Sequence, residues 1–185
     1  MEYLRHIGLE KRYIAILETA ISWVLALGML VYGVGKVRQF SGITARDTYV
    51  SEFTPMELMW AFYRASQDYV YIIGGFEILG GFLVLFYRTR LIGCLLLTAI
   101  LTNIILQDIF YSVHLGALAT AIWYQYLVII LMLMDYNRVK RTIVTAFTKK
   151  PKALIKYDSL MIIFLILSVI AIRIIEYVLT IHVFN

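Results

Sequence analysis

The sequence predicts an all-α fold: a transmembrane four-helix bundle, a C-terminal fifth hydrophobic helix, and a short interfacial helix between spans 1 and 2. The 185 residues are 62% apolar and 16% charged, whereas a soluble domain is about half apolar and about a quarter charged. No segment has the pattern of a strand, and a strand in lipid would need a closed barrel. Five stretches approach the length of about 20 apolar residues that a span requires. They are Tyr13–Val34, Tyr69–Tyr87, Leu91–Phe110, Ala117–Met134 and Leu160–Ile181.

We expect a single membrane domain over residues 1–185, with its core at about 13–141 and the extra helix at about 159–183.

The first four stretches meet the length requirement, and the fifth is less clear. Leu160–Ile172 is apolar without interruption, but Arg173 and Glu176 follow it. Each charge at mid-membrane costs about 2.5–3.5 kcal/mol, and each strongly apolar residue offsets only about 0.3–0.6 kcal/mol. Insertion is therefore near balance. Pairing of Arg173 with Glu176, three residues away, and a partner on another helix would favour spanning.

A short helix is predicted within the long connection Ser41–Ser66. Thr54 has the position of an N-cap, Pro55 is suited to the first helical residue, and Glu57 completes a capping box. Met56, Met59, Trp60 and Tyr63 follow at helical spacing. This helix is expected to lie in the outer membrane interface.

The distribution of Lys and Arg predicts the orientation. With a cytoplasmic N-terminus, twelve of these residues lie inside and four, including Lys36, lie in the connection outside. The positive-inside rule favours that arrangement, and the C-terminus is then outside if the fifth stretch spans. The basic loop Lys149–Lys156 would face anionic lipid headgroups, which accounts for the charge of this loop without a nucleic-acid partner.

Polar side chains within the apolar stretches predict a site. Glu77, Asn103, Gln125 and Arg173 all fall about 10–12 Å from the outer edge of the membrane core. Polar groups at that depth usually face protein or a cavity, so we expect an outward-facing pocket with a polar floor. Arg173 would keep Glu77 charged. The predicted ligand-binding residues are Glu77, Asn103, Asp108, Tyr111, Trp123, Gln125 and Arg173. The alternative is that these groups form interhelical hydrogen bonds that fix the bundle.

Several kinds of catalytic site find no support in the sequence. Cys94 is the single cysteine, so there is no CxxC pair, and the three histidines lack metal-ligand spacing. Dinucleotide, nucleophile-elbow and metalloprotease motifs are not found. We therefore expect no metal and no intrinsic cofactor, and a bound quinone is left open. Whether the protein is an enzyme is also left open.

Short motifs in sequence order carry a resemblance to a known family. They are Tyr32–Lys36, Gly75–Gly81 around Glu77, Leu85–Arg90, and Asn103–Val113. Together they resemble the DoxX-like family of small bacterial integral membrane proteins. Two residues depart from the family pattern. Asp108 stands where the family often has Asn, and Ser112 stands where it usually has Asp. The resemblance implies a four-helix bundle in the bacterial cytoplasmic (inner) membrane, and members are linked to quinone- and thiol-related redox work.

Three functions follow as hypotheses. The first is an accessory protein that binds an apolar small molecule, a quinone or lipid, or a partner transmembrane helix in the pocket. The second is a quinone-linked oxidoreductase subunit. The third is a small transporter or proton path. Membrane lipids are the expected partners, and a partner membrane protein or a homo-oligomer is left open.

Overall fold

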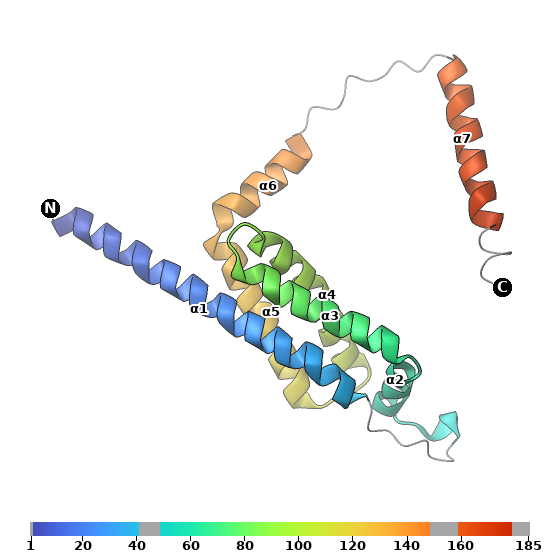
Figure 1. The fold of residues 1–185 in the computed structure, drawn as a ribbon, viewed down its shortest axis with the longest axis horizontal. Helices are drawn as coiled ribbons and strands as arrows, with labels where there is room; N and C mark the ends of the chain where they lie inside the picture. The colour runs from blue at the N-terminus through green and yellow to red at the C-terminus, as the bar shows by residue number, and fades with distance from the viewer. Residues whose placement is uncertain (1, 41–48, 149–158, 179–185) are drawn as a thin grey trace. The chain divides into compact units, whose positions relative to one another are not determined.

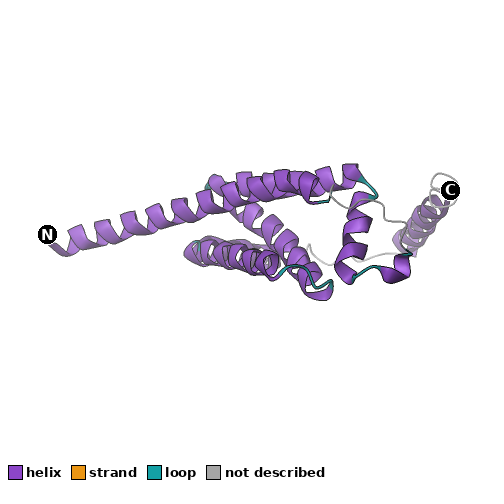
Figure 2. Ribbon diagram, turned by 90° about the horizontal axis from the view of Figure 1, so that it is seen from below, coloured by secondary structure: helices purple, strands orange, loops and turns teal. Residues whose placement is uncertain are grey.

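The computed structural model describes residues 2–40, 49–148 and 159–178, and every regular element in them is a helix (Figure 1; Figure 2). The all-helical prediction is therefore confirmed for the described residues. The elements are α1 (Glu2–Gln39), the 3-10 turn η1 (Val50–Glu52), α2 (Pro55–Arg64), α3 (Gln67–Leu85), α4 (Arg90–Phe110), α5 (Leu115–Met134), α6 (Tyr136–Thr148) and α7 (Ser159–Val178). The loop Lys149–Lys156 and the side chain of Glu176 lie outside the described part.

The chain divides into two compact units, Met1–Thr142 and Ile143–Asn185. In the first unit, four helices are long and apolar enough to cross a membrane: Arg12–Gln39, Gln67–Leu85, Arg90–Phe110 and Leu115–Met134. Many large apolar side chains on them are exposed, among them Trp23, Phe82 and Ile122, as expected of surfaces that face lipid. In the second unit, α7 is apolar over Ser159–Ile174, and spanning by the fifth stretch stays a prediction.

The four long helices of the first unit form a bundle. α1 packs against α3, α3 against α4, α4 against α5, and α5 returns to α1, and successive helices run in opposite directions (Figure 1). Buried leucine, methionine and valine side chains fill the interior, including Leu25, Met29, Val84, Leu97 and Leu131. Short connections between antiparallel neighbours are typical of such bundles.

α1 and α3 cross with their backbones in contact. A Cβ atom placed on Gly33 would lie 2.5 Å from the carbonyl oxygen of Gly74, and one placed on Gly74 would lie 2.5 Å from that of Gly33. Only glycine at both positions permits this approach. The crossing fixes the register of the two helices near one end of the bundle.

α2 covers that same end. Its predicted start is confirmed: the Thr54 hydroxyl accepts a hydrogen bond from the Glu57 N–H, and the Glu57 carboxylate accepts one from the Thr54 N–H. Met59 and Tyr63 of α2 pack in a second apolar cluster with Phe40, Val70 and Val113. The helix is thereby fixed over the ends of α1, α3 and α4.

Candidate functional site

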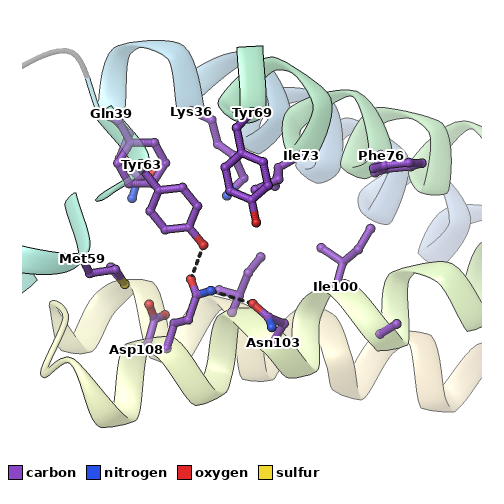
Figure 3. Close-up of a pocket in the computed structure, with 14 residues that line it drawn as sticks. Lys36, Gln39, Met59, Tyr63, Tyr69, Ile73, Phe76, Ile100, Asn103 and Asp108 are labelled. Carbon is purple, nitrogen blue, oxygen red and sulfur yellow. Dashed lines mark hydrogen bonds between the residues drawn. The ribbon is translucent and has the colours of Figure 1, made fainter. Parts of the chain in front are cut away.

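A cavity of about 310 Å³ lies between α1, α2, α3 and α4, beneath α2 (Figure 3). Most of its wall is apolar, and a few polar groups reach it. Its lining residues are Lys36, Gln39, Phe40, Met59, Tyr63, Tyr69, Ile73, Phe76, Ala99, Ile100, Asn103, Ile104, Gln107 and Asp108. An apolar chamber with a few convergent polar groups is typical of small-molecule sites.

A buried ion pair stands at the edge of the cavity. Lys36 Nζ lies 3.1 Å from Glu77 Oε1, and Glu77 is 0% exposed. Lys36 follows Gly33 by three residues and Glu77 follows Gly74 by three, so both stand one turn from the α1–α3 contact. Side chains in a helix lean toward its N-terminus. Because α1 and α3 run in opposite directions, the two side chains lean toward each other.

Lys36 corrects two expectations drawn from the sequence. The distribution of charges assigned Lys36 to the outside connection, but it lies within α1 and is buried, which removes one positive charge from the outside. The cation that the structure brings to Glu77 is also Lys36 rather than Arg173. Arg173 lies on α7 in the second unit, so its participation stays a prediction. Lys36 and Glu77 each follow a glycine by three residues, and this spacing is the signal from which the ion pair could have been predicted.

A hydrogen-bonded chain crosses the cavity from α2 to α4. The Tyr63 hydroxyl donates to Gln107 Oε1 at 2.8 Å, and Gln107 Nε2 donates to Asn103 Oδ1 at 2.7 Å (Figure 3). Burial raises the pKa of the Tyr63 hydroxyl, so this group stays protonated and keeps donating at neutral pH. Asn103 Oδ1 is an acceptor in this chain, so the side chain presents its amide Nδ2 as a further donor.

Aromatic rings form one side of the cavity. The Phe40 and Tyr63 rings stack with their centroids 4.5 Å apart at 20°, and the Tyr63 and Tyr69 rings stack at 6.0 Å and 15°. These three residues come from α2, α3 and the segment that follows α1. Together they form a wall of nearly parallel rings, which we call the aromatic wall.

Asp108 is a buried carboxyl group at the cavity. Asp108 is 7% exposed, and its Oδ2 atom accepts no hydrogen bond from any residue that the structure describes. The Lys36 ammonium is close enough to interact with Asp108 electrostatically, although its ion pair is with Glu77. Figure 3 shows Asp108 rising from α4 toward the side of the cavity where Met59 lies.

The remaining predicted site residues lie elsewhere. Tyr111 lines a neighbouring cavity of about 430 Å³, which shares Met59, Tyr63 and Gln107 with the first. Trp123 and Gln125 are on α5 and line neither of these cavities. Trp123 is 55% exposed, contrary to the expectation that it walls the pocket. Depth along a helix was predicted, but the direction in which a side chain points around the helix was not.

The chemistry that this arrangement supports is binding. Lys36 and Asn103 supply donors, Asp108 supplies an acceptor, and the remainder of the wall supplies apolar contact. Within the described residues, no three His, Cys, Asp or Glu side chains are grouped as a metal site would require. Cys94 is buried among the apolar side chains of the bundle interior.

Comparisons with known proteins add a distant relative. No family model matches the chain, and no solved structure matches it. The chain is 29% identical over 110 residues to a protein of Bacillus subtilis (strain 168) described as "Uncharacterized protein YwoB". The match covers 58% of this chain and 71% of that relative. Membership of the DoxX-like family therefore stays a prediction.

Proposed function

We propose that this chain is an integral membrane accessory protein that binds an amphiphilic small molecule, a lipid or a quinone, in the cavity beneath α2. The observation that carries the proposal is the cavity itself. About 310 Å³ of space lies among four helices, with a largely apolar wall and with Lys36, Asn103 and Asp108 at its surface. Sites for small molecules commonly combine these features.

The arrangement of charges supports binding over a purely structural role for these polar groups. A bundle fixed by interhelical hydrogen bonds would leave its polar groups paired with one another. Here Asp108 Oδ2 lacks a hydrogen bond among the described residues, and Asp108 is one of the residues that line the cavity. A bound molecule would satisfy it.

The proposal includes the DoxX-like family and the bacterial cytoplasmic membrane, with the N-terminus inside. The segments Tyr32–Lys36 and Gly75–Gly81, which carry the resemblance, contribute the two partners of the buried ion pair. Because these two segments meet in space, we interpret them as one functional unit.

A quinone-linked oxidoreductase subunit is the second candidate. Lys36 and Asn103 place N–H donors at the cavity, and quinone carbonyl oxygens accept hydrogen bonds. The redox chemistry in that case belongs to the quinone, and the chain would bind and orient it.

The test is to fill the cavity and measure what the purified protein retains. Ile100 lines the cavity, whereas Ile92, on the same helix, is exposed on the outer surface of the bundle. We expect Ile100→Trp to lower the amount of co-purifying lipid or quinone per mole of protein about tenfold, because the added ring occupies the site. The Ile92→Trp variant should retain it.

The measurement is mass spectrometry and ultraviolet absorbance of an organic extract of the full chain, purified in a mild neutral detergent. Absorbance identifies a quinone, and mass distinguishes it from a lipid. Equal retention by the wild type and both variants would show that no molecule occupies this cavity, and the proposal would be rejected.

A further inference from the structure

Among the residues that the structure describes at the cavity, the two carboxyl groups Glu77 and Asp108 stand beside one cation, Lys36. Lys36 is neutralised by Glu77 at 3.1 Å, and Asp108 then stands as a second carboxylate beside a single cation. The other residues that line the cavity carry no formal charge. A buried carboxyl group without a cation of its own takes up a proton instead of staying charged. A positive group that arrives at the site would pair with Asp108 in its ionised form, and Asp108 would release that proton.

The aromatic wall has the same preference. The faces of phenylalanine and tyrosine rings carry negative charge density and attract cations within about 6 Å of the ring centroid. Phe40, Tyr63 and Tyr69 all line the cavity. Tyr63 is stacked between the other two rings, so Phe40 and Tyr69 are the rings with a face left for a cation. Lys36 Nζ lies 6.0 Å from the centroid of Phe40, which shows that a cation is already accommodated beside this wall.

We propose that the molecule bound in this cavity carries a positively charged nitrogen, as an amine- or trimethylammonium-bearing amphiphile does, with the nitrogen held between Asp108 and the aromatic wall. This inference rests on the proposed function and narrows its ligand to one chemical class. The apolar tail would lie along Ile73, Phe76 and Ile100, which line the same space.

Other head groups fit less well. An anionic head group would be repelled by Asp108, because Lys36 is already engaged with Glu77. A quinone has only acceptor oxygens, so it can pair with Asp108 only when this side chain is protonated and donates the hydrogen bond. A cationic nitrogen supplies the missing positive charge in a region of low dielectric constant, where charged contacts are strongest.

The test compares three soluble probes of equal alkyl length: hexyltrimethylammonium, 1-hexanol and hexyl sulfate. Binding to the full chain in a neutral detergent, stripped of co-purifying molecules, is measured by isothermal titration calorimetry. We expect the ammonium probe to bind about tenfold more tightly than hexanol and hexyl sulfate to bind least, because charge-assisted and cation–π contacts act only on the cation.

Variants connect this preference to one residue. Asp108→Asn should reduce the preference for the ammonium probe to about that for hexanol, and Asp108→Glu should retain it. Asp68→Asn is the matched control, because Asp68 is exposed at the start of α3 and does not line the cavity. Circular dichroism of each variant verifies its helix content.

Hexanol binding as tightly as the ammonium probe, or a preference that survives in Asp108→Asn, would overturn the inference. Neither result contradicts the proposed function if the Ile100→Trp variant still retains less of the co-purifying molecule than the wild type does. Failure of the proposed function would instead appear as equal retention in Ile100→Trp and the wild type.

Discussion

At the scale of single residues, the ion pair of Lys36 and Glu77 organises the site. Glu77 is 0% exposed, so its charge depends on the ammonium 3.1 Å away. A buried ion pair adds little to stability compared with well-packed apolar side chains of similar volume. Breaking it by removing one partner is costly, because the other charge stays buried and unpaired. The pair therefore positions Lys36 at the cavity more than it stabilises the bundle.

This asymmetry gives a prediction for stability. Lys36→Met should lower the free energy of unfolding by about 3–5 kcal/mol, because Glu77 loses its cation. The double variant Lys36→Met/Glu77→Leu should recover most of that loss. Unfolding by sodium dodecyl sulfate, followed by circular dichroism, measures both. Additive losses in the double variant would show that the two side chains are not coupled.

The sequence predicted part of this site, for reasons that are visible residue by residue. Asn103 and Asp108, which line the cavity, were predicted because a polar group inside an apolar stretch is conspicuous. Lys36 was missed because a lysine at the end of an apolar stretch resembles an ordinary loop charge. Tyr63 and Gln107 were missed because their hydrogen bond joins residues 44 apart in sequence, which only the packing of α2 over α4 brings together.

At the scale of elements, local signals and long-range packing differ in how well sequence predicts them. The start of α2 was predicted because the capping box involves only Thr54 and Glu57, three residues apart. The contact of α1 with α3 was not predicted, because many glycines could mediate close approach and only geometry selects Gly33 and Gly74. That contact sets the register that brings Lys36 to Glu77.

Alanine substitutions at two neighbouring glycines, Gly74 and Gly75, test the close contact of α1 with α3. Gly74→Ala should destabilise the bundle by about 1–3 kcal/mol, because its methyl group would meet the Gly33 carbonyl oxygen at 2.5 Å. A Cβ at Gly75 meets no atom within 4 Å, so Gly75→Ala should be neutral or stabilising by up to about 1 kcal/mol. Thermal unfolding in detergent compares the two. Equal effects would contradict the close crossing.

At the scale of the whole molecule, composition and hydropathy were enough for the coarse architecture. Four of the five stretches are confirmed as helices long and apolar enough to cross a membrane. Hydropathy, however, measures how apolar a helix is and not which of its faces meets a neighbour. That is why Trp123 and Gln125, which were predicted as site residues, lie on α5 outside the cavity wall.

The central claim is that a small molecule occupies the space beneath α2. Hydrogen exchange measured by mass spectrometry tests it directly, because exchange reports local opening segment by segment. The full chain is compared as purified and after its bound molecule is removed. We predict slower exchange with the molecule present in Pro55–Arg64 and in the adjoining ends of α3 and α4, with α5 unchanged. Protection on α5 alone, or none in α2 while the molecule is retained, would contradict the account.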